Sequence, residues 1–123
     1  KEDLQMAAEI RNDRGVVRIT NSVIAKMAGY AATKCYGVVG MATRSSKDGI
    51  AKLLKLESMD RGIKVRVSED GLDVVMFVIL EYGVNIGTVG EIIRNNVKYQ
   101  VEQMTGIDVK SVTVNVESLR VNE

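Results

Sequence analysis

Seven consecutive apolar residues, Val74–Leu80, form the longest uninterrupted apolar run of the chain. A membrane-spanning helix needs about 20 such residues, so we expect a buried strand here and no membrane span. The preceding segment, 63–68, alternates apolar and polar residues, which is typical of a half-buried strand. Asp70-Gly71 lies between the two segments and is a strong signal for a tight turn. The sequence therefore predicts an antiparallel hairpin of strands 63–68 and 72–82.

A two-residue turn at Asp70-Gly71 also predicts which residues of this hairpin lie opposite each other. The expected pairs are Glu69–Leu72, Val67–Val74, Val65–Met76 and Ile63–Val78. Residues directly opposite in an antiparallel pair share a face of the sheet. One face is then apolar, and we expect helices to cover it: Ile63, Val65, Val67, Val74, Met76, Val78 and Leu80.

The second face of the hairpin carries Val75, Phe77 and Ile79. A contiguous exposed apolar patch on a protein surface indicates a partner, whereas isolated exposed apolar residues are ordinary. We therefore expect self-association or partner docking at these three residues. An equally weighted alternative is that residues 1–14 or the segment 43–62 cover them.

The rest of the chain predicts two main helices and three further strands. Residues 16–19 and 38–41 are short strands, and Ser22–Cys35 is a helix rich in small residues, capped by Thr20 or Asn21. Residues 43–48 form a loop, and Ile50, Leu53 and Leu54 form one or two helical turns. A capping box at Thr88–Glu91 begins a long helix that ends at Gly106, and valines from Val109 to Val116 form the last strand.

The predicted order is β-α-β-(α)-β-β-α-β, which is an α+β pattern. We expect a two-layer architecture in which two main helices lie on one face of a mixed sheet. Residues 1–14 are interpreted as a loose or weakly helical lead-in, and residues 15–123 as a single domain. The length of 123 residues fits one domain.

The composition excludes several classes of chemistry. The chain has no His and one Cys, so Ser–His or Cys–His catalysis, His-ligated metal sites and internal disulfides are impossible. Cys35 has no activating setting beyond the adjacent Lys34 and is interpreted as a small buried residue. We expect no catalytic residue, metal or cofactor, and the lone Cys and the absence of a signal-peptide pattern suit the cytoplasm.

Two charged groups of residues are candidate contact surfaces. Along the predicted long helix, Arg94 and Lys98 alternate with Glu91 and Glu102 at helical spacing, typical of a solvated face that a partner could meet. A basic cluster precedes and enters strand 63–68: Lys52, Lys55, Arg61, Lys64 and Arg66. Acidic residues are interleaved with this cluster and the net charge is only +1, so a mixed solvated surface is favoured over a phosphate-binding one.

The string Gly87-Thr88-Val89-Gly90 resembles the GxxG clamp of KH nucleic-acid-binding domains. That clamp joins two helices and usually carries a basic residue, whereas here a strand precedes the string and both inner residues are uncharged. The favoured interpretation is that Gly87 permits a turn while Thr88 caps the following helix.

The order of several segments resembles the alkaline-shock, envelope-stress-response family of Gram-positive bacteria. The segments that carry the resemblance are Val17–Thr20, Val23–Ala25 with Ala28, Tyr36–Met41, Gly62–Val65, Leu72–Gly83, Asn85-Ile86, Val97–Gly106 and Val112–Val116. The resemblance implies a small, non-enzymatic cytoplasmic protein and supplies no catalytic residues. Some members of that family assemble into higher-order structures and reach the membrane through a separate anchoring protein, and others are linked to a fatty-acid kinase. This chain is more similar to the second group, so the resemblance implies a functional link to such a kinase.

Together these observations predict a scaffold or adaptor linked to the envelope stress response, acting by self-association and protein–protein contacts. The expected contact residues are Val75, Phe77 and Ile79 on the sheet and Arg94 and Lys98 on the long helix. The alternative is a KH-like nucleic-acid-binding module that uses Gly87–Gly90. An enzyme is the third and weakest hypothesis, because the composition offers so few catalytic groups.

Overall fold

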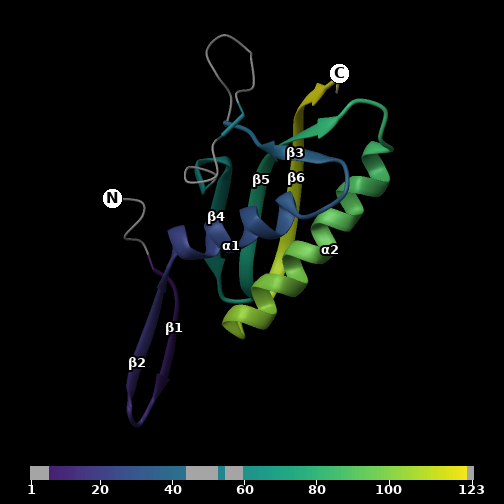
Figure 1. The fold of residues 1–123 in the computed structure, drawn as a ribbon. Helices are drawn as coiled ribbons and strands as arrows, with labels where there is room; N and C mark the ends of the chain where they lie inside the picture. The colour runs from purple at the N-terminus through teal and green to yellow at the C-terminus, as the bar shows by residue number, and fades with distance from the viewer. Residues whose placement is uncertain (1–5, 44–52, 55–59, 122–123) are drawn as a thin grey trace.

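The computed structural model describes residues 6–43, 53–54 and 60–121. Its elements in chain order are β1 (Met6–Asn12), β2 (Gly15–Thr20), α1 (Asn21–Thr33), β3 (Val38–Met41), β4 (Ile63–Ser68), β5 (Gly71–Glu81), α2 (Ile86–Thr105) and β6 (Val109–Arg120). Figure 1 shows the main sheet behind two helices and a separate hairpin, β1–β2, that extends away from the body.

β5 is the strand to which every other strand of the main sheet is hydrogen-bonded. β4 pairs antiparallel with its first half and β3 antiparallel with its second half, while β6 lies along its other edge in parallel. A parallel neighbour requires a crossover connection, and α2 supplies it between β5 and β6. The sheet is therefore mixed, as predicted.

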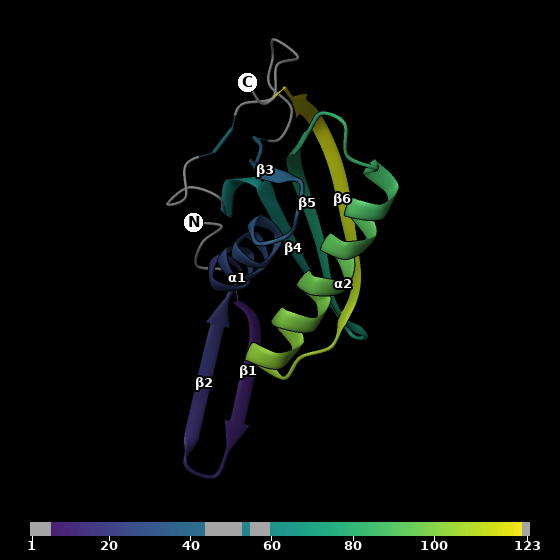
Figure 2. The same cartoon turned by 45° about the vertical axis from the view of Figure 1, so that its right-hand side comes forward.

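Both helices pack against one face of this sheet (Figures 1 and 2). Alternate residues of β5 point toward them and are completely buried: Leu72, Val74, Met76, Val78 and Leu80. α1 contributes Ile24 and a row of small residues to the same core, and α2 contributes an apolar stripe made of Val89, Ile93, Val97 and Val101. The predicted two-layer α+β architecture is confirmed.

Small residues on α1 bring the two helices close together. Ala28 and Ala32 are completely buried and Ala31 nearly so. The side-chain amide of Asn96 on α2 donates a hydrogen bond to the backbone oxygen of Ala31 at 3.0 Å. A bulky residue at these positions would separate the helices and break this contact.

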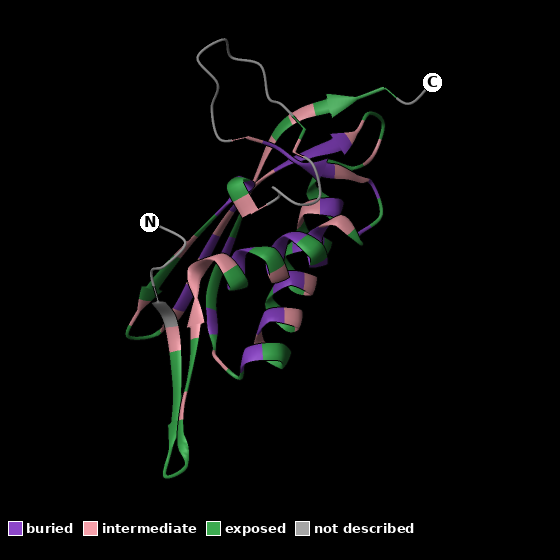
Figure 3. Cartoon of the chain, turned by 60° about the vertical axis from the view of Figure 1, so that its left-hand side comes forward, coloured by how far each residue is buried: buried purple, intermediate pink, exposed green. Residues whose placement is uncertain are grey.

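The prediction for residues 1–14 is wrong where the structure describes them. β1 pairs with β2 as a hairpin arm, with Glu9 opposite Arg18 and Ile10 opposite Val17. Ala, Glu and Asn are poor strand formers, so β1 carries little local signal. Its strand conformation depends on pairing with β2 across a turn that ends at Gly15, which has a φ of +144°. Most residues of the arm are exposed, as Figure 3 shows.

The predicted β4–β5 hairpin is confirmed, but its register differs from the prediction. Ser68 pairs with Gly71 and Val67 with Leu72, so the turn residues are Glu69 and Asp70. Gly71 has a φ of +132°, and a Cβ there would meet the backbone oxygen of Asp108 at 2.5 Å, which fixes this glycine at the start of β5. Because the register shift is two residues, each side chain keeps its predicted face.

Two predictions of helical structure also need correction. Leu53 is not helical but forms an isolated antiparallel bridge with Ala42, and the Leu54 amide donates to the oxygen of Met41 at 2.8 Å. Ile50 and the loop 44–48 lie outside the described residues. α1 ends at Thr33, two residues earlier than predicted, while Thr20 caps it as expected: its hydroxyl accepts a hydrogen bond from the Val23 amide at 3.4 Å.

α2 begins at Ile86, earlier than the predicted capping box at Thr88–Glu91. Its N-cap is Asn85, whose side-chain oxygen accepts a hydrogen bond from the Thr88 amide at 2.9 Å. Asn85 thus has the structural role of satisfying an otherwise unpaired helix donor. The predicted end is correct, because Gly106 has a φ of +74° and terminates the helix in the left-handed conformation.

We expect Asn85→Ala to lower the free energy of unfolding by about 1 kcal/mol, because the helix loses its capping acceptor. Thr88→Ala is the matched control, since Thr88 contributes its backbone amide to the cap and its side chain is exposed. Urea unfolding followed by circular dichroism measures both. An equal loss for the two variants would contradict the assignment of Asn85 as the cap.

Candidate functional site

The structure separates the three predicted residues on the outer face of β5. Val75 and Phe77 are half-buried, whereas Ile79 has 0% exposure. Gly40 of β3 pairs with Ile79. A Cβ atom added at Gly40 would lie 2.7 Å from the Leu53 side chain, which places Leu53 beside Ile79. Of the three predicted apolar residues, Val75 and Phe77 are therefore the two that remain partly exposed on this face.

The neighbours of Val75 and Phe77 on β4 and β6 are polar, whereas the buried Ala42 donates its backbone amide to the Phe77 oxygen at 2.8 Å. Lys64 of β4 lies opposite Val75, and Thr113 and Asn115 of β6 lie next to the two residues. Asn115 donates to the backbone oxygen of Met76 at 3.3 Å. We call this surface, Val75 and Phe77 within a polar surround, the outer sheet face. It lies on the side of the sheet opposite both helices.

Arg94 and Lys98 lie on α2, and their roles differ. Arg94 forms an exposed ion pair with Glu91 at 2.8 Å, which is worth little in water. Lys98 instead joins α2 to the start of β6: its ammonium donates to Glu102 at 2.7 Å and to the backbone oxygen of Val109 at 2.9 Å. Lys98 therefore has a structural role, whereas Arg94 remains a surface cation that a partner could contact.

Glu102 completes this connection between α2 and β6. Its carboxylate also accepts the Val109 amide at 2.8 Å. The hydrogen bond from Lys98, together with the one from the Val109 amide, lowers the pKa of the Glu102 carboxyl below its ordinary value. The charged form of Glu102 is thus the one that the folded chain favours.

The Gly87–Gly90 string lies in the first turns of α2 and joins no two helices. The structural element that a KH clamp requires is absent from this part of the described chain, so the KH-like alternative is not supported. Cys35 is buried as predicted, and its thiol lies 3.6 Å from the Ala31 oxygen and from the Asn96 amide. Burial raises the pKa of this thiol, and the hydrogen bond from Asn96 opposes the rise.

The predicted basic cluster does not form a binding site among the described residues. Lys64 and Arg66 are exposed on β4, and Arg61 is exposed just before it. Lys52 and Lys55 lie outside the described residues. No group of three or more potential metal ligands was found within residues 6–43, 53–54 and 60–121.

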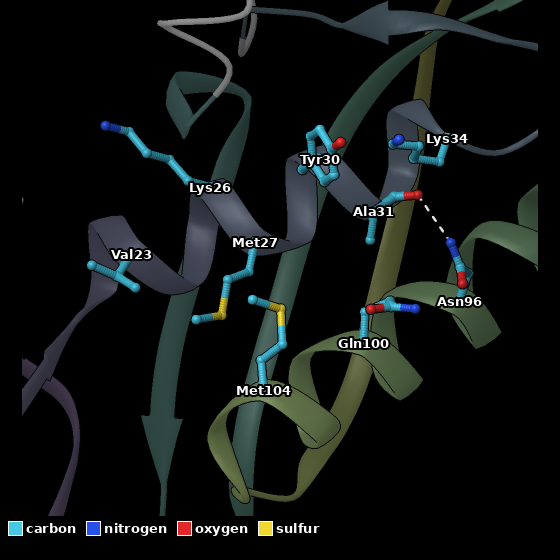
Figure 4. Close-up of a pocket in the computed structure, with 9 residues that line it drawn as sticks. All are labelled: Val23, Lys26, Met27, Tyr30, Ala31, Lys34, Asn96, Gln100 and Met104. Atoms are coloured by element: carbon cyan, nitrogen blue, oxygen red, sulfur yellow. Dashed lines mark hydrogen bonds between the residues drawn. The ribbon is translucent and has the colours of Figure 1, made fainter.

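A groove between α1 and α2, with a volume of about 710 Å³, was not predicted from the sequence. Met27 of α1 and Met104 of α2 point toward each other across it (Figure 4). The groove is lined by Val23, Lys26, Met27, Tyr30, Ala31, Lys34, Asn96, Gln100 and Met104. We call it the interhelical groove.

The walls of the interhelical groove are unusually exposed for apolar residues on helices. Val23 is 44%, Tyr30 51% and Met104 61% exposed. A second hollow of about 520 Å³ shares Lys34 and Asn96 with the groove and adds Tyr36 and Tyr99. Apolar side chains therefore continue along the seam between the helices.

One sequence signal did exist for the interhelical groove. Val23, Met27 and Met104 belong to the apolar stripes that predict the core faces of the two helices. In the structure Met27 is partly buried against the core, whereas Val23 and Met104 are exposed at the edges of these stripes. A sequence pattern shows which residues form the apolar stripe of a helix, but it does not show how much of that stripe other elements cover. The pattern alone therefore assigns all of these residues to the core.

Comparison with known proteins shows the family to which the chain belongs. The alkaline-shock protein family, which has a cell envelope-related function, matches residues 9–121, and the chain belongs to this family. The expected resemblance to the alkaline-shock, envelope-stress family is thereby confirmed.

Several bacterial proteins are similar along most of the chain. YloU of Bacillus subtilis is 40% identical over 117 residues, covering 94% of this chain and 98% of YloU. Spy1614 of Streptococcus pyogenes is 33% identical, covering 94% of this chain and 97% of its own length. A stress response regulator gls24 homolog of Streptococcus pyogenes is 28% identical, covering 89% of this chain and 62% of its own. No solved structure matches the chain significantly. Within the described residues, neither helix has the length and apolar character needed to cross a membrane.

We expect Glu102→Gln to destabilise the fold at neutral pH, because the charged acceptor between Lys98 and Val109 is lost. The lowered pKa of Glu102 means that its stabilising effect is present above its unfolded-state pKa and disappears as the pH falls through its folded-state pKa. The unfolding free energies of wild type and variant should therefore converge in acid. Arg94→Gln is the control and should show a smaller difference at neutral pH, and a pH-independent gap for Glu102→Gln would contradict the role of its charge.

Cys35 should react slowly with Ellman's reagent in the folded chain, because the thiol is buried and its pKa is raised. Full reactivity should appear in urea. Tyr36→Cys in a Cys35→Ala background is the control, because position 36 is 77% exposed and should react at once. Rapid labelling of Cys35 without urea would show that the thiol is accessible after all.

Proposed function

We propose that this chain is a non-enzymatic scaffold in the envelope stress response, acting by self-association and by contacts with other proteins. The observation that carries the proposal is the presence of partly exposed apolar side chains on opposite sides of one sheet. The outer sheet face, with Val75 and Phe77, lies on one side, and the interhelical groove lies on the other. A scaffold needs two such surfaces, because one can join copies while the other holds a partner.

The chemistry of the described residues supports a binding role. The polar groups at the interhelical groove are two lysines, two amides and a tyrosine hydroxyl, and Cys35 is buried with a raised pKa. Such a set can orient a bound group through hydrogen bonds and charge but holds no activated nucleophile paired with a base. Family membership supplies the biological setting, an envelope-related function.

The outer sheet face is the proposed contact between copies. Phe77 is the single phenylalanine of the chain and is half-buried on this face. Aromatic residues that remain partly exposed within a polar surround are typical anchors of protein interfaces. A membrane-anchoring protein and a fatty-acid kinase, both implied by the family resemblance, are the proposed partners for the remaining surface, which would place the chain at the membrane periphery.

Replacement of Phe77 by Lys should reduce the assembled state, because a charge at the centre of an apolar contact must be desolvated when copies meet. Multi-angle light scattering measures the change in mass. Gln103→Lys is the control, since it adds the same charge at an exposed position on α2. Circular dichroism establishes that both variants are folded, and an assembly that survives Phe77→Lys unchanged would remove the outer sheet face as the contact.

A further inference from the structure

The interhelical groove has a positive rim. Lys26 and Lys34 line it on the α1 side, and no acidic residue is among its described lining residues. Between Asp13 and Asp48 the sequence contains no Asp or Glu, so nothing within α1 offsets these lysines. Both acidic residues of α2 are engaged in ion pairs on their own helix, because Glu91 pairs with Arg94 and Glu102 with Lys98.

Two methionines make the lining of the groove adaptable. Met27 and Met104 point toward each other across it, and the flexible methionine side chain fits partners of different shape (Figure 4). Tyr30 forms one wall and carries Lys34 above its ring, with the ammonium 4.6 Å from the ring centre. α1 alone offers a track of about 20 Å along its 13 residues. A groove of this shape between two helices accepts the apolar stripe of a third helix.

A second copy of this chain does not suit the groove. Two grooves face to face would oppose Lys26 and Lys34 with the same lysines, which is repulsive. The exposed apolar pair on the β1–β2 arm, Ile10 and Val17, is no better, because the arm is cationic: Arg11, Arg14 and Arg18 outnumber Glu9 and Asp13. The acidic turn at Glu69-Asp70 is too short to fill the groove.

We propose that the interhelical groove binds an acidic amphipathic helix of a different protein. Apolar residues on one stripe of that helix contact Met27, Tyr30 and Met104, and its carboxylates lie next to Lys26 and Lys34. The inference rests on the proposed scaffold function and names the chemistry of the partner. In this proposal, a second copy of the chain binds at the outer sheet face, and the helix of the partner protein binds in the interhelical groove.

Two synthetic helical peptides test the inference. Both carry leucine at positions i, i+3, i+4 and i+7, and their remaining positions are Glu and Gln in one peptide and Lys and Gln in the other. At low ionic strength the acidic peptide should bind the full chain at least about tenfold more tightly than the basic peptide, measured by fluorescence anisotropy. Raising the salt concentration should reduce this preference.

Variants of the chain locate the binding. Lys26→Glu with Lys34→Glu should reverse the preference between the peptides, and Met104→Asp should weaken both. The control is Lys110→Glu with Arg120→Glu, which changes the same number of exposed charges on β6 and should leave the preference intact. All of these side chains are exposed, so the fold should tolerate the changes, and circular dichroism checks this.

Four outcomes would overturn the inference: no binding, equal binding of the two peptides, an equal effect of the control variant, or displacement of the acidic peptide by anionic phosphatidylglycerol vesicles. The last outcome would assign the groove to a lipid surface. A chain that assembles in light scattering but binds neither peptide would refute the groove assignment and leave the scaffold function standing. A monomeric chain that binds the acidic peptide would refute self-association alone.

Discussion

The burial of one face of β5 beneath both helices is the interaction on which the rest of the structure depends. Val74, Met76, Val78 and Leu80 are completely buried there, and removing such a side chain from water is worth about 1.5–3 kcal/mol. The same strand supplies the hydrogen bonds that hold β3, β4 and β6. Because β6 runs parallel to β5, α2 must cross the sheet between them, and this crossover places α2 beside α1. The packing of the core therefore also brings α1 and α2 together, and the interhelical groove lies between them.

The two candidate surfaces follow from this arrangement. A two-layer fold covers one face of its sheet and leaves the other to solvent or to a partner, so the outer sheet face with Val75 and Phe77 exists because the described chain places both helices on the opposite side. On that covered side, two helices of unequal length meet along part of their surfaces, and the apolar edges of both remain outside the core. The Lys98–Glu102–Val109 contacts fix the end of α2 against β6 and keep the wall with Met104 in place. On α2, the residues that hold the helix against β6, Lys98 and Glu102, are therefore different from Met104, which lines the groove.

Most of the fold could be predicted from local signals. The apolar run in β5, the alternation in β4, the cap at Thr20 and the glycine at Gly106 each act within a few residues, and the structure has all of them. The errors lie where pairing outweighs local preference. β1 has weak strand formers and becomes a strand only opposite β2, and Leu53 forms an isolated bridge with Ala42 instead of a helical turn. The β4–β5 register shifts by two residues because Gly71 lies against Asp108. For the candidate site, strand alternation identifies Val75 and Phe77, whereas the burial of Ile79 depends on Leu53, a residue from a distant segment.

By itself the sequence determined an α+β pattern with neither histidine chemistry nor an internal disulfide, because composition and periodicity are properties of the chain alone. The order of its segments gave the resemblance to the alkaline-shock protein family, which the family match then showed. The tertiary structure decided which apolar residues remain at the surface. Val23, Tyr30 and Met104 lie on the same helices as buried apolar residues, and the way α1 and α2 pack on the sheet leaves them exposed. The positive charge of the groove also depends on the tertiary structure. Glu91 and Glu102 form ion pairs on their own helix, whereas Lys26 and Lys34 line the rim of the groove.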